Sequence, residues 1–264
     1  MKLQHVDSKD GTRIAYETVG TGPTLVLVGG AFNDRSGRTS GTPLAALLAS
    51  HFTVVAYDRR GRGDSADAPS YQTERELEDL TALIAASGGS AHVFGMSSGA
   101  ILPLAAACAH LPIEKLALYQ PPLVLDADRL EGLAILATRL EDATKRDARH
   151  EATTLFLTEV MQMPAPAVAQ MQKSPYWPSL EALAHTLSYD VRLTLLGPGS
   201  FERAARLEAP VQLLRGDATP PWIRASVDAL TNRLPNGHLR VLSGQSHDVD
   251  IQVLARELIE FFEG

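Results

Sequence analysis

The sequence predicts an α/β fold in which a mostly parallel, doubly wound sheet of eight strands carries a helical cap. Three observations predict it. Short apolar runs alternate with helix-length segments in the first half of the chain and again near its end. Between these parts, residues 123–207 show helical periodicity and no strand pattern. Finally, Gly95-x-Ser97-x-Gly99 stands where a predicted strand passes into a predicted helix.

The composition fits a single large domain. The chain has 264 residues, of which 45% are hydrophobic, and a net charge of −7. Its single cysteine, Cys108, excludes an internal disulfide, and we expect an inert, buried thiol. No basic run and no apolar stretch of about 18 residues occurs. We therefore expect a cytoplasmic protein with no nucleic-acid or membrane partner, and we leave a homodimer open.

The first four strands follow from short runs rich in apolar and β-branched residues. Residues 3–8 and 12–18 form a predicted hairpin, because Asp10-Gly11 between them is a turn signal. Residues 23–28 and 52–57 are largely apolar, as expected of strands buried on both faces of a parallel sheet.

Two helices are predicted in this part of the chain, over residues 44–50 and 74–86. Thr73 and Glu76 fit a capping box at the start of the second helix. Its acidic residues lie opposite a row of leucines, so we interpret them as a solvated face.

The central feature is the turn around Ser97. Residues 91–96 read as a buried strand and residues 100–109 as an apolar helix. A serine between them is a nucleophile elbow, in which side chains at positions 95 and 99 would collide with neighbouring backbone. The next strand covers residues 115–119.

The second half of the chain contains the cap and the return to the sheet. We assign residues 1–122 and 208–264 to the core and residues 123–207 to a helical cap. After the cap, strands are predicted at 210–215 and 238–242, and helices at 222–234 and 251–262. The loop before the last helix contains His247.

With these elements in place, the chain resembles the α/β-hydrolase superfamily. The resemblance rests on four signatures in the expected order: Val28-Gly29-Gly30-Ala31, Asp58-x-Arg60-Gly61-x-Gly63-x-Ser65, Gly95-x-Ser97-x-Gly99 and Gly244-x-x-His247. It implies that Ser97 is the nucleophile and that His247 takes its proton. It also implies an oxyanion hole formed by the backbone N–H groups of Ala31 and Ser98.

The cap supplies aromatic residues and methionines, which a mostly apolar substrate pocket would need. For each residue alone, packing of the cap against the core is the simpler interpretation. As a group we expect five residues to line the substrate pocket: Gly30, Phe32, Met161, Tyr176 and Trp177.

The catalytic acid departs from the superfamily pattern. One usual position falls on Thr219, with Asp217 nearby at a different offset, and the other falls on Gln120. The chain also resembles lactonases similar to zearalenone hydrolase, through Gly95 to Ala100, Ala218-Thr219-Pro220 and Trp177. In those enzymes the acid is a glutamate after the sixth strand. This resemblance implies an acid-to-amide change at Gln120, and the sequence leaves open whether that change is natural or engineered.

These residues predict a serine hydrolase that cleaves a lactone or ester of an apolar small molecule. Two alternatives use the same fold: a non-hydrolytic lyase or cyclase, and a ligand-binding protein with little turnover. An impaired lactonase is a third, because a glutamine accepts the imidazole N–H but cannot stabilise imidazolium by charge. We expect no metal and no cofactor, since neither a metal-ligand cluster nor a nucleotide fingerprint occurs.

Overall fold

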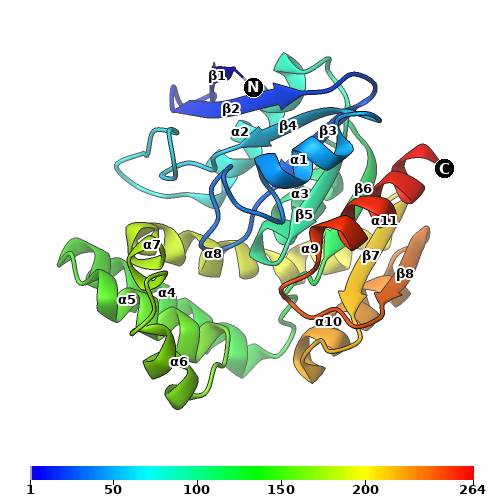
Figure 1. Ribbon diagram of the computed structural model, residues 1–264. Coiled ribbons are helices and arrows are strands. Elements are labelled where there is room, and N and C mark those ends of the chain that lie inside the picture. Colours follow the sequence, from blue (N-terminus) through cyan, green and yellow to red (C-terminus); the bar gives the residue numbers. More distant parts are fainter. Residues whose placement is uncertain (1) are drawn as a thin grey trace.

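The computed structural model describes residues 2–264 and shows a twisted sheet with helices on both of its faces (Figure 1). The eight strands lie in the order β1-β2-β4-β3-β5-β6-β7-β8. The first two pairs in this order are antiparallel and the other five are parallel, which confirms the predicted sheet. The strands are β1 (Leu3–Asp7), β2 (Arg13–Val19), β3 (Thr24–Val28), β4 (Thr53–Tyr57), β5 (Ala91–Met96), β6 (Ile113–Tyr119), β7 (Val211–Gly216) and β8 (Gly237–Leu242).

The hairpin predicted at Asp10-Gly11 is confirmed. Gly11 has a φ of +84°, which a glycine adopts without strain, and its N–H donates to the carbonyl of Ser8. The ladder that follows pairs Asp7 with Arg13. The turn therefore sets the register of the first two strands.

Two apolar cores lie on opposite faces of the sheet. Helices α2 (Thr73–Ala86), α3 (Ser98–Cys108) and α10 (Pro221–Arg233) cover one face. Helices α1 (Thr42–Leu48) and α11 (Ile251–Glu263) cover the other. The central strand β5 is buried along its whole length, as expected of a parallel strand covered on both faces.

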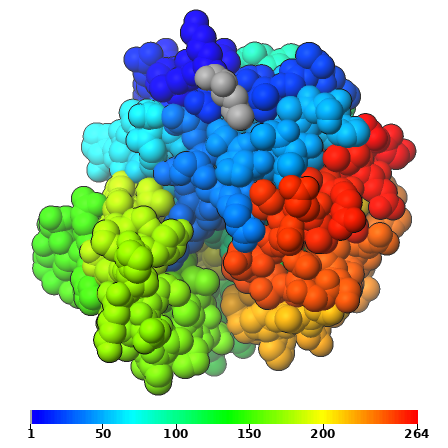
Figure 2. All heavy atoms as spheres, in the orientation of Figure 1, coloured from blue at the N-terminus to red at the C-terminus, as the bar shows by residue number. Residues whose placement is uncertain are grey.

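Helices alone occupy the part of the chain between β6 and β7. We call them the cap, and α4 to α7 project to one side of the sheet in Figure 1. The space-filling view shows a hollow between this part and the C-terminal segment (Figure 2). The cap consists of α4 (Ala127–Lys145), α5 (Arg149–Leu155), the π-helix η1 (Phe156–Val160), α6 (Ala165–Met171), α7 (Trp177–Ala182), the 3₁₀ helix η2 (Ala184–Thr186), α8 (Leu187–Thr194) and α9 (Gly197–Ala204).

The acidic residues of α2 correct the sequence interpretation. Gln72 occupies the N-cap position and makes no side-chain cap hydrogen bond, so the capping box expected from Thr73 and Glu76 does not form. Glu76 and Asp79 are each 1% exposed rather than solvated. Glu76 pairs with Arg59, and Asp79 pairs with Arg60, each through two nitrogens of the guanidinium. The charges face inward because the turn after β4 presents buried arginines to this helix.

Candidate active site

Ser97 occupies a strained turn between β5 and α3. Its φ of 55° and ψ of −131° are unusual for a residue with a side chain. The two flanking glycines are required by space. A Cβ on Gly95 would lie 2.7 Å from the Cα of Ala100, and a Cβ on Gly99 would lie 2.4 Å from the carbonyl oxygen of Gly29. The elbow geometry expected from the sequence is therefore present.

Gln120 and His247 meet at the carboxyl end of β6. The Nδ1 atom of His247 lies 2.7 Å from the Oε1 atom of Gln120, which is fully buried. The Gln120 amide nitrogen donates to Thr219 Oγ1 at 2.7 Å and to the carbonyl of Ser246 at 3.3 Å. Thr219 in turn donates its proton to the carbonyl of Gly216. These contacts fix the amide with its oxygen toward the imidazole, so Nδ1 carries the proton and Nε2 keeps a free lone pair.

The environment of His247 favours the neutral ring. Burial lowers the pKa of His247 below its usual value, while the charge of Asp248 partly opposes this effect. A neutral imidazole is the form that accepts a proton from a serine hydroxyl.

Asp217, the other candidate acid, has a different role. Both of its carboxylate oxygens accept the backbone N–H of Gly244 at 3.0 Å. This hydrogen bond lowers the pKa of the exposed Asp217 carboxyl. Asp217 therefore ties the end of β7 to the start of the histidine loop, and Gln120 is the residue that contacts the imidazole.

The glycine loop after β3 packs directly against the elbow. A Cβ on Gly30 would lie 3.0 Å from the Cβ of Ser97. The N–H of Ala31, an expected oxyanion donor, donates in this structure to Ser98 Oγ at 3.0 Å. Ser98 Oγ donates to Asp190 at 2.8 Å and is buried, so it is not placed as a second nucleophile. The Ser98 backbone N–H is at the first turn of α3, where helical N–H groups lack intrahelical partners.

A buried ionic cluster joins this loop to the cap. Arg59 and Arg62 both bind the carboxylate of Asp190, at 2.7 and 2.5 Å. The same guanidinium groups donate to the carbonyls of Gly29 and Gly30, at 3.3 and 2.6 Å. Burial alone would raise the pKa of Asp190, but the two arginines hold it below its usual value. Asp190, from α8, therefore helps to position the loop that faces Ser97.

Of the five residues expected to line the substrate pocket, Gly30 and Phe32 lie in the loop after β3, and Met161, Tyr176 and Trp177 lie in the cap. Phe32 packs edge-on against Phe156, with ring centroids 5.3 Å apart. Trp177 is 4% exposed and belongs to a separate apolar cluster of the cap. Met161 and Tyr176 are 37% and 61% exposed.

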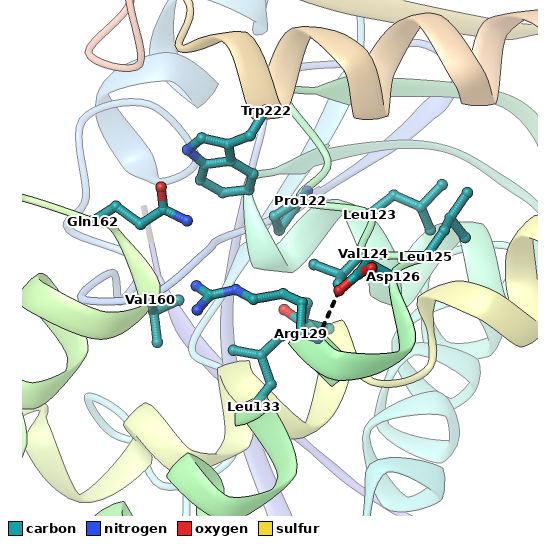
Figure 3. Close-up of a pocket in the computed structure, with 11 residues that line it drawn as sticks. Pro122, Leu123, Val124, Leu125, Asp126, Arg129, Leu133, Val160, Gln162 and Trp222 are labelled. Atoms are coloured by element: carbon teal, nitrogen blue, oxygen red, sulfur yellow. Dashed lines mark hydrogen bonds between the residues drawn. The ribbon is translucent and has the colours of Figure 1, made fainter. Parts of the chain in front are cut away.

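A cavity of about 240 Å³ lies instead between the cap and α10 (Figure 3). None of the five expected pocket residues lines it. It starts two residues after Gln120, at Pro122, and Trp222 forms another wall. The other lining residues are Leu123, Val124, Leu125, Asp126, Arg129, Leu133, Val160, Gln162 and Thr194.

Three residues of this region could not be predicted from the sequence. Asp190, Arg129 and Trp222 belong to no motif, because each acts through contacts between distant segments. For Asp190 alone the sequence contains an indirect indication. Two arginines in the glycine-rich turn after β4 require carboxylate partners if they are buried. The described residues 2–264 contain no group of three or more His, Cys, Asp or Glu side chains that could hold a metal ion. In the same range, no helix has the length and apolarity needed to cross a membrane.

Comparison with known proteins decides the family. The sequence matches the Alpha/beta hydrolase family over residues 25–258. The chain belongs to this family. The crystal structure of an alpha/beta hydrolase from Sphaerobacter thermophilus DSM 20745 superimposes with a TM-score of 0.86 at 45% identity, covering 98% of this chain and 100% of that one.

Other similar proteins are more distant. The uncharacterized hydrolase YraK of Bacillus subtilis (strain 168) is 28% identical over 197 residues, which is 70% of each chain. An enol-lactonase from Burkholderia xenovorans LB400 shares the fold, with a TM-score of 0.74 at 20% identity over 99% of this chain and 100% of that one. The comparisons support the alpha/beta hydrolase superfamily and do not single out the zearalenone-hydrolase-like lactonases.

Proposed function

We propose that this alpha/beta hydrolase is a serine hydrolase that cleaves a lactone or ester of a mostly apolar small molecule. The observation that carries the proposal is the fixed orientation of Gln120, which leaves the Nε2 atom of His247 free to act as a base. Ser97, which has a strained backbone conformation at the start of α3, supplies the nucleophile.

In the proposed reaction, Ser97 Oγ attacks the substrate carbonyl while His247 Nε2 takes the hydroxyl proton. The tetrahedral intermediate carries its negative charge beside the first turn of α3 and the loop after β3. When it collapses, the carbonyl–oxygen bond breaks and His247 returns the proton to the leaving oxygen. Water, deprotonated by His247, then attacks the acyl carbon, the bond to Ser97 Oγ breaks, and His247 returns the proton to Ser97. When the substrate is a lactone, the acid and the alcohol formed by hydrolysis remain parts of one ring-opened molecule.

The amide at position 120 limits this chemistry in a specific way. In a serine-protease triad, an amide in place of the acid costs about 10⁴ in kcat, because it selects the wrong histidine tautomer. Here the amide oxygen faces the ring, so the tautomer is correct, and what is missing is the charge that stabilises imidazolium. We therefore propose substrates with a good leaving group, such as enol or aryl esters and lactones, which require less help from the base.

Three finer expectations stay proposals. Lactonase activity of the zearalenone-hydrolase type is one, with Gln120 in place of the glutamate. The proposed arrangement also suits a lyase, a cyclase or a ligand-binding protein, in which a neutral Gln120 would position rather than activate. A cytoplasmic location and the absence of a cofactor are further predictions from the sequence alone, which leaves a homodimer open.

The first test is covalent labelling by a fluorophosphonate, followed by hydrolysis of p-nitrophenyl acetate and dihydrocoumarin. We expect the intact chain to label at Ser97 and to hydrolyse at least one of the two substrates. Ser97→Ala should abolish labelling and reduce turnover by at least about 10³-fold, since the nucleophile is lost. Ser179→Ala, at an exposed cap position, is the matched control. Labelling or turnover that survives Ser97→Ala would exclude Ser97 as the nucleophile.

A further inference from the structure

The cavity between the cap and α10 has the chemistry of a binding site for an organic acid. Arg129, from α4, is half-buried and directs its guanidinium into the cavity (Figure 3). Within residues 2–264, no carboxylate lies within salt-bridge distance of this guanidinium, and its one hydrogen-bond partner is the carbonyl of Glu159 at 2.6 Å. The Arg129 guanidinium therefore has donors without a protein partner that face the cavity.

The nearby acidic side chains are engaged elsewhere. The Glu159 carboxylate pairs with Arg139 at 2.7 Å. Asp126 lines the cavity, but it is exposed and accepts the backbone N–H of Arg129 as the N-cap of α4. Neither residue neutralises the Arg129 guanidinium.

Other donors face the same space. Figure 3 shows the amide of Gln162 and the indole of Trp222 at the cavity, across from Arg129. No hydrogen bond of either side chain occurs within the described chain. Gln162 has a φ of 56° and follows the π-helix η1. Strained backbone and π-helical turns of this kind are concentrated at functional sites.

The remaining wall is apolar. Pro122, Leu133 and Val160 contribute to it, together with the ring of Trp222. At about 240 Å³, the cavity is smaller than the usual 300–1,000 Å³ of drug-sized sites, so it fits a compact molecule. A guanidinium, an amide and an indole N–H within an apolar wall match a carboxylate attached to a hydrophobic body.

We infer that this cavity binds a small, mostly apolar carboxylic acid, with its carboxylate on Arg129 and its apolar part against Trp222 and Leu133. The site does not depend on the proposed hydrolase activity. It is assembled from the cap, the segment after β6 and the start of α10, and it contains neither Ser97 nor His247.

The test compares phenylacetate with its neutral isostere phenylacetamide by isothermal titration calorimetry. It uses the intact chain and its Ser97→Ala form, so that failure of the proposed catalysis cannot affect the result. We expect phenylacetate to bind at least about tenfold more tightly than the amide. Arg129→Met should remove this preference. Lys145→Met, at the C-terminal end of the same helix, should keep it, because Lys145 is exposed and pairs with Asp142. Equal affinities, or a preference that survives Arg129→Met, would overturn the inference.

A second measurement locates the site even if Arg129→Met does not fold. The chain has two tryptophans, so the two indole N–H signals in an NMR spectrum can be assigned with Trp222→Phe. We expect phenylacetate to shift the Trp222 signal in the intact chain and to leave the Trp177 signal in place. A shift confined to Trp177, or no shift at saturating phenylacetate, would place the acid elsewhere and contradict the inference.

Discussion

At the scale of single residues, the surroundings of Gln120 suit an amide better than a carboxylate. The carbonyl of Ser246 can only accept a hydrogen bond, and the Thr219 hydroxyl already donates its proton to Gly216. The Thr219 oxygen therefore requires a donor on the side chain at position 120, whereas the Ser246 carbonyl also accepts the Tyr119 hydroxyl. A carboxylate there would place an oxygen against the Ser246 carbonyl at about the present 3.3 Å.

Gln120→Glu should therefore change stability and pH dependence together. At pH 8 we expect a loss of about 1–3 kcal/mol in the free energy of unfolding, because the buried Thr219 oxygen loses its donor and a carboxylate oxygen faces the Ser246 carbonyl. In the native chain burial lowers the pKa of His247, so kcat/KM should rise with pH with a midpoint below the usual histidine pKa. A carboxylate beside the ring favours imidazolium, which should move this acidic limb to higher pH.

Urea unfolding and the pH profile of kcat/KM measure the two effects. Gln170→Glu adds the same charge at an exposed cap position and should change neither. An unchanged stability in Gln120→Glu would contradict the hydrogen-bond assignment at this side chain.

At the scale of elements, two helical glycines have opposite roles. Gly99 in α3 approaches the backbone of Gly29, whereas a Cβ on Gly132 in α4 would meet no atom within 4 Å. Gly99→Ala should cost about 1–3 kcal/mol of stability and lower kcat, since the loop beside Ser97 must move. Gly132→Ala should stabilise by about 0.5–1 kcal/mol. Thermal unfolding of the two variants measures both changes. A Gly99→Ala variant that is more stable than the native chain would disprove the close approach of Gly99 to the Gly29 backbone.

Helix α8 contributes one carboxylate to two arginines of the core. Asp190→Asn keeps the side-chain shape but leaves two buried guanidinium groups with one fewer anion. We expect a loss of about 3–5 kcal/mol, because breaking a buried ion pair leaves an uncompensated charge. Urea denaturation followed by circular dichroism measures it, with the exposed Asp128→Asn as control. A loss below about 1 kcal/mol would show that the cluster does not depend on Asp190.

At the scale of the whole molecule, the sheet and the helical segment between β6 and β7 could be predicted because they depend on local patterns. Strand runs and helical periodicity occur within each segment, and the elbow is a single continuous motif. The family resemblance offered Gln120 and Asp217 as alternative partners of His247, and only the tertiary structure shows that Gln120 makes the contact.

The buried ionic cluster could not be predicted in the same way. Acidic residues at helical spacing give the same pattern whether they face water or buried arginines, which is why Glu76 and Asp79 were misinterpreted. Likewise, the cavity combines Arg129 with Trp222, which are 93 positions apart along the chain (222 minus 129), and no local pattern relates them.

The shared carboxylate of Asp190 has a consequence for the modularity of this protein. A cap taken from a relative would bring its own substrate preference, but it would also have to bring an anion to the place of Asp190. Without that anion, the arginines that hold the loop beside Ser97 would lose their counter-charge. Exchange of caps between relatives is therefore constrained by charge balance inside the core as well as by the shape of the surfaces where cap and core meet.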